Sequence, residues 1–182
     1  MRIKYVLILL TLCLTMPQVA IAQKKKEVAI QLYSVRDLIN KGGDLNQILK
    51  NLANMGYTSV ETANYNDGKF YGKTPREFKQ MVEKNGMTVL SSHCSRGLSD
   101  EELASGNLTE ALKWWDQCIA AHKTAGMEYI VTPYLSVPNT LKGLQTYCDY
   151  YNEIGKRCKA AGLKYGYHNH AHEFKKVEDK EL

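Results

Sequence analysis

The residues best suited to chemistry are concentrated in the segment HNHAHEF, residues 168–174 of the 182-residue chain. His168 and His170 are two positions apart, so on a β-strand both side chains point the same way, and His172 and Glu173 follow at once. Imidazole and carboxylate groups together suit a borderline divalent ion such as Zn²⁺ or Mn²⁺. We interpret the segment as a metal-binding site; the alternative is an ordinary polar loop.

Polar residues also end four earlier segments that have the character of strands. A strand alternates its faces with a period of two, and the face with the last polar residue of each strand carries Gln31 and Tyr33, Ser59 and Glu61, Ser91 and His93, Thr132 and Tyr134, and His168 and His170. Considered alone, Glu61 could be a charge at a helix N-terminus, and His93 a hydrogen-bonded core histidine. Polar residues on the same face at all five strand ends favour a shared site. If the strands form a barrel, their carboxyl ends converge on one mouth.

The elements that must position these residues repeat one pattern: a helical segment, a glycine and a short apolar strand. The glycines are spaced 30, 40 and 36 residues apart, about one βα unit, at Gly56, Gly86, Gly126 and Gly162. Each follows a last helical turn, where a residue tolerant of positive φ is needed. Strands separated by helices run parallel, so the pattern predicts an α/β fold, either a barrel or an open doubly wound sheet. We expect its five parallel strands at residues 28–33, 58–63, 88–93, 129–134 and 164–170.

The predicted helix starts agree with this phase. A capping residue is answered by Gln or Glu three positions later in four pairs: Asp44 and Gln47, Thr74 and Glu77, Ser99 and Glu102, and Asn107 and Glu110. Two apolar stripes at helical spacing are expected to pack on the sheet: Leu108, Leu112, Trp115, Ile119 and His122, then Leu141, Leu144, Cys148, Tyr151, Ile154, Cys158 and Ala161. No GxGxxG, GxxxxGKS or GxxxxGKT motif follows a strand, which argues against a nucleotide-binding open sheet.

The charge of the chain bears on its partners, and the cysteines bear on its core. Beyond residue 22 the chain carries 22 basic and 19 acidic residues, a weak balance that gives no case for nucleic acid, whose binding usually needs a concentrated basic stripe. We interpret Cys94, Cys118, Cys148 and Cys158 as small buried apolar residues. Cys148 and Cys158 lie ten residues apart on one predicted helix, too far to bridge each other.

The first 22 residues have the features of a secretory signal peptide. Arg2 and Lys4 precede an uncharged apolar run at residues 5–16, and a small-residue Ala-Ile-Ala sequence suits cleavage after position 22. The apolar run is too short to span a bilayer comfortably. We therefore expect an exported, periplasmic or extracellular protein without a stable membrane anchor, whose residues 23–182 belong to one domain.

Four stretches of the chain match a known family as a set. They are QLYSVRD at 31–37, MGYTSVE at 55–61, SSHC at 91–94 and GYHNHAHEF at 166–174, of which the first and last are the specific ones. With them the chain resembles the sugar phosphate isomerase/epimerase group of xylose-isomerase-like TIM barrels, relatives of endonuclease IV. The resemblance implies a partial (β/α)8 barrel, with about five of eight units present and a divalent metal (Mn, Zn, Mg or Co) at the mouth of the complete barrel.

The resemblance also implies roles for individual residues. The family's ligand after strand five is a glutamate, which corresponds to Glu173, with His168 and His170 as alternative ligands or substrate contacts. Glu61 and His93 match positions that face the substrate in similar proteins, so Glu61, His93, His168 and His170 are the candidate catalytic residues. The implied chemistry is proton abstraction next to the carbonyl of a keto sugar, through an enediolate, by a metal-dependent isomerase or epimerase.

Other readings of the same family stay open. A keto-sugar lyase or hydratase shares the enediolate, and a carbohydrate-binding barrel without turnover shares the site. The phosphodiester chemistry of the endonuclease branch is disfavoured by export and by the weak charge. Since a small-molecule carbohydrate is the expected partner, export suggests a free or oxidised sugar rather than a sugar phosphate.

Five units of a barrel have consequences for the isolated chain. The strands at residues 28–33 and 164–170 would be left with open edges, which invite pairing with another chain. We expect the chain alone to self-associate through these edges and to be inactive, as the product of an incomplete gene or an incomplete sequence.

Overall fold

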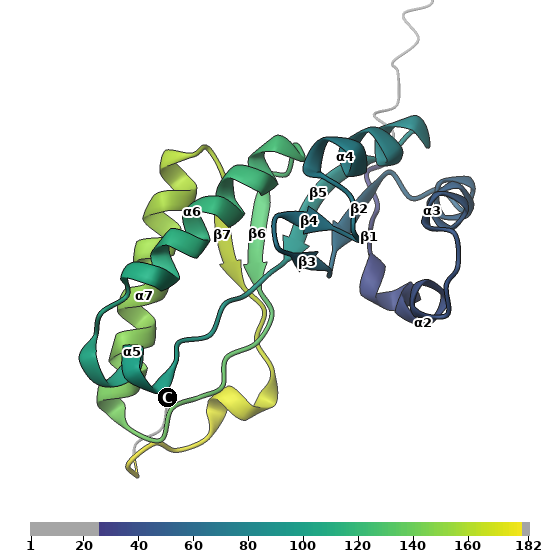
Figure 1. Ribbon diagram of the computed structural model, residues 1–182. Helices are drawn as coiled ribbons and strands as arrows, with labels where there is room; N and C mark the ends of the chain where they lie inside the picture. The colour runs from purple at the N-terminus through teal and green to yellow at the C-terminus, as the bar shows by residue number, and fades with distance from the viewer. Residues whose placement is uncertain (1–25, 180–182) are drawn as a thin grey trace, which may run out of the picture.

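The fold is an open parallel sheet, curved and covered by helices on its outer side. The computed structural model describes residues 26–179, and Figure 1 shows how their elements are arranged. The sheet has the order β1-β2-β5-β6-β7, and each neighbouring pair is parallel. Its strands are β1 (Ala29–Gln31), β2 (Ser59–Thr62), β5 (Thr88–His93), β6 (Tyr129–Thr132) and β7 (Lys164–Tyr167). The predicted set of five parallel strands is confirmed.

Helices connect the strands, as successive βα units require. Helix α4 packs against β5 and α7 packs against β7, and Figure 1 shows α6 and α7 beside β6 and β7. The longer helices are α3 (Leu45–Asn54), α4 (Pro75–Lys84), α6 (Thr109–Thr124) and α7 (Leu141–Ala160). Shorter pieces are α2 (Arg36–Asn40), α5 (Asp100–Ser105) and the 3₁₀ turns η1 (Leu32–Val35) and η2 (Ala171–Phe174). An antiparallel hairpin of β3 (Tyr65–Asn66) and β4 (Lys69–Phe70) follows β2.

The predicted residue caps the helix at three of the four predicted helix starts. The four repeated glycines all have positive φ, from 75° to 97°, and Thr74 and Ser99 form complete capping boxes with Glu77 and Glu102. The Asp44 side chain also caps its helix, by accepting a bond from the Asn46 N–H, but its predicted partner Gln47 bonds the Asn51 side chain instead.

The exception is the start of α6, which was predicted at Asn107. The helix begins at Thr109 with Leu108 as its N-cap, because the Leu108 carbonyl accepts the first helical bond, from the Leu112 N–H. Asn107 instead uses its side-chain oxygen to accept bonds from the N–H and hydroxyl of Thr109. The capping residue predicted here is therefore one position too early.

Four of the five strands are shorter than predicted, and this changes the face assigned to Thr132. Strand β6 ends at Thr132, where Pro133 has no N–H to continue the ladder. The Thr132 side chain is 1% exposed and its hydroxyl hydrogen-bonds that of Tyr165 within the helix-facing core. The prediction that Thr132 shares a face with Tyr134 is wrong, because regular alternation stops where the strand stops.

Two apolar clusters fill the space between the sheet and the helices. One, beneath α3 and α4, includes Leu49 and Phe78, and the other, beneath α6 and α7, includes Trp115 and Tyr150. Three of the cysteines and His122 are buried, as predicted. Cys148 is exposed, so that prediction is wrong: the first half of α7 turns the larger rings of Tyr147 and Tyr150 inward, which bury far more apolar area than a thiol.

The structure describes both edges of the sheet but not the predicted signal peptide. Strands β1 and β7 form the two edges of the described sheet, and self-association through them stays a prediction. The predicted signal peptide at 1–22 lies outside the described residues. Between residues 26 and 179, no helix combines the length and apolar character needed to cross a membrane.

The variant Tyr150→Phe tests the core beneath α6 and α7. The Tyr150 hydroxyl accepts a 2.6 Å hydrogen bond from Trp115 Nε1 and donates one of 3.1 Å to the Arg96 carbonyl. Its loss leaves a buried indole N–H unpaired, so we expect urea denaturation to show a free energy of unfolding lower by about 1–3 kcal/mol. Tyr129→Phe, which loses only an exposed contact with Lys164, should cost less than about 0.5 kcal/mol. Equal losses in the two variants would contradict this account of the core.

Candidate active site

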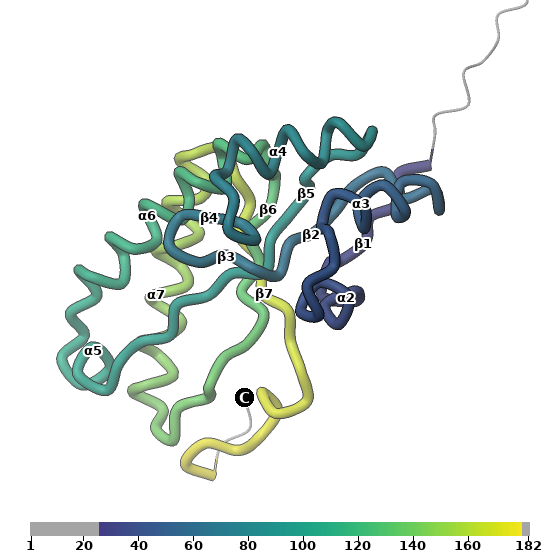
Figure 2. Tube along the Cα trace, turned by 45° about the vertical axis from the view of Figure 1, so that its right-hand side comes forward, coloured from purple at the N-terminus to yellow at the C-terminus, as the bar shows by residue number. Residues whose placement is uncertain are grey.

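Side chains from the carboxyl ends of the strands surround one cavity. Its volume is about 580 Å³, and its lining includes Gln31, Tyr33, His93, Tyr134, His168 and His170. A cavity of this size is typical of small-molecule sites. Figure 2 shows why these residues meet: the segments that follow β5, β6 and β7 all leave the sheet at the same end.

The Glu61 carboxylate lies directly behind this lining, held from both neighbouring strands. Gln31 Nε2 donates a 2.6 Å hydrogen bond to Oε1, and Ser91 Oγ donates one of 2.5 Å to Oε2. The ladder places Gln31 opposite Glu61 and Glu61 opposite Ser91, so the three side chains form a row across the sheet. His93 Nε2 lies 3.2 Å from Glu61 Oε1. These contacts fix the orientation of a carboxylate that is still 20% exposed.

Three imidazole rings extend from Glu61 toward β7. The ring centroids of His93 and His168 are 5.2 Å apart, and those of His168 and His170 are 4.8 Å apart. Burial lowers the pKa of His93; the Glu61 carboxylate opposes this, whereas His168 and His170 lower it further. The net direction is downward, so His93 is neutral at pH 7 and one ring nitrogen can accept a proton.

Glu173 lies beside His170, outside the cavity lining described above. Tyr167 Oη donates a 2.5 Å hydrogen bond to Glu173 Oε1, and the His170 N–H donates one of 2.6 Å to Oε2. Burial raises the pKa of the Glu173 carboxyl, but the hydrogen bonds from Tyr167 and from the backbone outweigh it and lower the net pKa. Glu173 is therefore an anion at neutral pH.

The donors near Glu173 partly fit a divalent ion. Ligand atoms of His170, His172 and Glu173 all lie within 4.8 Å of one another. However, His172 Nε2 is 2.8 Å from the Leu135 carbonyl, which only accepts, so this nitrogen carries a proton and cannot bind an ion. Each Glu173 oxygen retains a second lone pair, and His170 is half exposed. Glu173 and His170 therefore fit a metal in this conformation, and His172 could contribute only its Nδ1 atom.

The predicted residues fall into two adjoining groups. Glu61, His93, His168 and His170 are brought together as the strand phase predicted, whereas Glu173 is joined to this group only through His170. Tyr33 lies in η1, beyond the end of β1, but still lines the cavity.

Sequence reasoning missed one part of the cavity wall, the β3–β4 hairpin. Its residues Tyr65 and Asn66 contribute to the lining, and its turn residues Asp67 and Gly68 have φ of 47° and 76°. Two central residues with positive φ define a type I′ turn, for which Asp-Gly is a strong signal. The Asp67-Gly68 pair could therefore have predicted this hairpin.

The pKa of His93 offers a test of the Glu61 contact. Nuclear magnetic resonance titration of the imidazole carbons should place the pKa of His93 below 6.5. Glu61→Gln should lower it further, because the attraction between the carboxylate and the protonated ring is lost. Glu83→Gln, on the exposed side of α4, serves as the control and should leave it unchanged. A higher pKa in Glu61→Gln would show that the two groups are not in contact.

Several solved structures share this architecture. A sugar phosphate isomerase/epimerase from Parabacteroides distasonis ATCC 8503 is 28% identical with a TM-score of 0.72, over 89% of this chain and 58% of that one. The IolI protein with a bound zinc atom has a TM-score of 0.58 at 13% identity, over 78% of this chain and 51% of that one. Mannonate dehydratase from Streptococcus suis serotype 2 has a TM-score of 0.50 at 14% identity, over 65% and 48%. The last two likenesses concern the fold alone.

The sequence comparison assigns the family. No curated protein sequence matches the chain. The chain spans 58% of the length of the Parabacteroides structure, and its five parallel strands correspond to part of a barrel. The profile of one family matches residues 49–179, most of the described chain. The chain therefore belongs to the xylose isomerase-like TIM barrel family.

Proposed function

We propose that the protein is a divalent-metal-dependent sugar isomerase or epimerase in which Glu61 and His93 move a proton next to the carbonyl of a keto sugar. The observation that carries the proposal is the Glu61 carboxylate, fixed by Gln31 and Ser91 and 3.2 Å from His93. The 28% identical structure from Parabacteroides distasonis is a sugar phosphate isomerase/epimerase, which supports a carbohydrate as the substrate.

The proton acceptor is the Glu61 carboxylate, whose Oε1 lies 3.2 Å from His93 Nε2. Proton abstraction from carbon requires a base that is close to the substrate and correctly oriented. Gln31 and Ser91 prevent the carboxylate from turning away, and His93 reaches the cavity lining. Return of the proton to the neighbouring carbon of the enediolate gives isomerisation, whereas return to the opposite face of the same carbon gives epimerisation and needs a donor on that face.

The remaining lining residues would bind the sugar. His168 and His170 offer ring N–H groups to sugar hydroxyls, and both line the cavity beside His93. Tyr33 and Tyr134 are 55% and 54% exposed, and their ring faces can pack against the apolar face of a sugar. This combination of donors and aromatic surface suits a small carbohydrate of low charge.

Glu173 and His170 would hold the divalent ion. When bound, such an ion acts as a Lewis acid that polarises the sugar carbonyl and so acidifies the neighbouring C–H. The hydrogen bond from Tyr167 orients the Glu173 carboxylate, as outer hydrogen bonds do for metal ligands. Mn²⁺, Zn²⁺ and Co²⁺ suit a carboxylate and an imidazole, whereas Mg²⁺ prefers oxygen ligands and would depend on Glu173 and water. We further propose that the protein acts after export, as its amino-terminal 22 residues suggest.

Exchange of carbon-bound hydrogen in heavy water tests the proton transfer. The full translation product of the gene, loaded with Mn²⁺ and incubated with keto sugars, should incorporate deuterium next to the carbonyl. Glu61→Gln should slow this exchange by at least about 100-fold, the usual contribution of a positioned base, while Glu83→Gln should not. Exchange at the same rate in Glu61→Gln would contradict the proposed base.

The products distinguish the alternatives. Loss of water or of an alkoxide from the exchanging sugar would identify a lyase or hydratase that shares the same base. Saturable sugar binding without any exchange in the unaltered protein would show a carbohydrate-binding barrel and would overturn the proposed catalysis.

Metal binding tests the role of Glu173. Calorimetric titration with Mn²⁺ should show affinity weakened by more than about 10-fold in Glu173→Gln, because even outer-shell changes have effects of this size. Glu128→Gln is the matched control. Glu128 directly precedes the amino end of β6, whereas the proposed ion lies beyond the carboxyl ends of the strands, so this variant should bind Mn²⁺ as the unaltered protein does. Equal affinity in both variants would exclude Glu173 as a ligand.

A further inference from the structure

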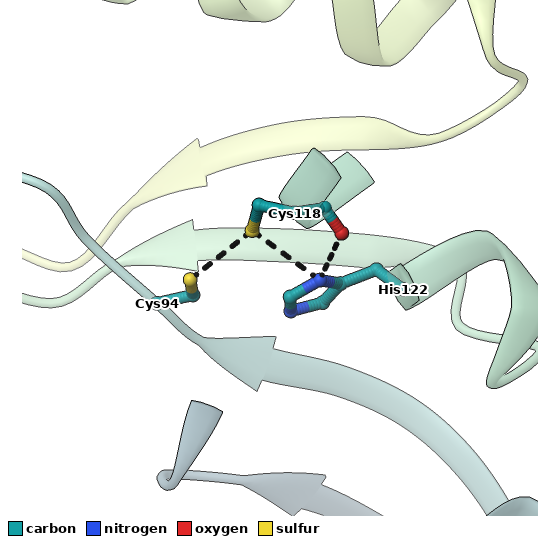
Figure 3. A group of neighbouring side chains, drawn as sticks. All are labelled: Cys94, Cys118 and His122. Atoms are coloured by element: carbon teal, nitrogen blue, oxygen red, sulfur yellow. Dashed lines mark hydrogen bonds between the residues drawn. The ribbon is translucent and has the colours of Figure 1, made fainter. Parts of the chain in front are cut away.

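Two cysteines meet in the core at the carboxyl end of β5. Cys94 directly follows the strand and Cys118 lies in α6, and their sulfur atoms are 3.3 Å apart. Both side chains are buried, at 5% and 0% exposure. Figure 3 shows the two sulfurs facing each other, with the ring of His122 beside them.

We propose that Cys94 and Cys118 form a disulfide bond under oxidising conditions. Bond formation brings the sulfurs from 3.3 Å to about 2.05 Å, a movement within reach of small side-chain rotations. The bond would link the end of a strand to the helix that covers it, closing a loop between residues 24 positions apart. It would also fix the backbone next to His93, which lines the cavity.

The neighbours of Cys118 are compatible with the oxidised form. His122 Nδ1 lies 2.7 Å from the Cys118 carbonyl and 3.4 Å from its sulfur. Since a carbonyl only accepts, this nitrogen carries the proton and donates to both atoms. A disulfide sulfur keeps its lone pairs, so no hydrogen bond from His122 is lost when the thiol hydrogen is removed.

The other described cysteines are poorer partners. Cys148 is exposed on α7, and Cys158 is buried ten residues further along the same helix. These two are separated by about 15 Å along the axis and cannot reach each other. Cys158 is also outside the group whose ligand atoms lie within 4.8 Å, which consists of Cys94, Cys118 and His122.

A metal ion is the competing occupant of this group, and it fits less well. A structural zinc site needs four ligands, whereas the group offers three. The ring nitrogen nearest the sulfurs, His122 Nδ1, already commits its proton to the Cys118 carbonyl. His122 Nε2 is buried without a hydrogen-bond partner among the described atoms, which matches a neutral ring packed in an apolar core.

Oxidation of the two thiols requires an electron acceptor, which can be a small-molecule disulfide such as oxidised glutathione. The Cys94 thiolate attacks one glutathione sulfur and releases reduced glutathione, leaving a mixed disulfide. The Cys118 thiolate then attacks the Cys94 sulfur and releases the second glutathione. Two protons pass from the protein thiols to the two released thiolates, so the protein loses two hydrogen atoms and the glutathione disulfide gains them.

Burial determines when this reaction can occur. Burial, followed by the contact with Cys94, strongly raises the pKa of the Cys118 thiol, and the thiol form is not a nucleophile. The bond should therefore form while the chain folds and resist reduction afterwards. We expect dithiothreitol to reduce it at least about 100-fold more slowly in native buffer than in denaturant.

Mass spectrometry tests the bond directly. The full translation product of the gene, without residues 1–22, is refolded in a buffer of oxidised and reduced glutathione, denatured, blocked with N-ethylmaleimide and digested with trypsin. We expect peptide 85–96, which holds Cys94, linked to peptide 114–123, which holds Cys118. Cys148 and Cys158 should carry the blocking group. This readout is independent of catalytic activity and of metal loading at Glu173.

Paired variants add a stability readout. Oxidation should raise the melting temperature of the unaltered chain by about 5–10 °C, and that of Cys148→Ser equally. Cys118→Ala should show no such rise, and if it fails to fold, the peptide analysis of the unaltered chain still decides. Four blocked cysteines after refolding, a link to Cys148 or Cys158, or one zinc ion per chain with reduced Cys94 and Cys118 would each overturn the proposal.

Discussion

The register of three neighbouring parallel strands is the constraint on which the candidate site depends. It places Gln31, Glu61 and Ser91 in one row, so that a partly buried carboxylate receives a hydrogen bond from each side. A charge removed from water requires such partners. A shift of one residue in either pairing would turn Gln31 or Ser91 to the opposite face and leave Glu61 without them.

The helix-facing side of the same strands helps to hold this register. Thr62 donates a 2.8 Å hydrogen bond to Ser92 where β2 and β5 pair, and Thr132 bonds Tyr165 from β7. These hydroxyl groups are buried among apolar side chains, where unpaired polar groups are costly. Each face therefore specifies the same alignment: the outer face through packing and paired hydroxyls, and the inner face through the Glu61 contacts.

Much of this arrangement could be predicted because it depends on local signals. Glycines after helices, capping pairs and the alternation of strands gave the five parallel strands, and the phase of their polar ends brought Glu61, His93 and His168 together. Thr132 was misplaced because alternation was counted past Pro133. The inward face of α7 was misread because the YCDYY sequence offers rings on several sides, and only the shape of the core selects Tyr147 and Tyr150.

Irregular turns and contacts between distant segments could not be derived from the sequence. The Glu173 carboxylate accepts hydrogen bonds from Tyr167 and from the His170 N–H because the 3₁₀ turn η2 folds back on the end of β7. The sequence pattern did not predict that turn. The meeting of Cys94 with Cys118 likewise depends on how α6 crosses the sheet. Membership of the xylose isomerase-like family extends the local picture to a barrel whose remaining wall must be supplied by segments other than the strands described.

We propose that the carboxyl ends of these strands form one carbohydrate site around Glu61 and His93. A crystal structure of the gene's full product with Mn²⁺ and an unreactive polyol analogue of a keto sugar tests it most directly. We expect the polyol in the cavity lined by His93, His168 and Tyr134, with a carbon next to the carbonyl position facing the Glu61 carboxylate. Density for the polyol elsewhere, or a Glu61 side chain directed away from Gln31 and Ser91, would contradict it.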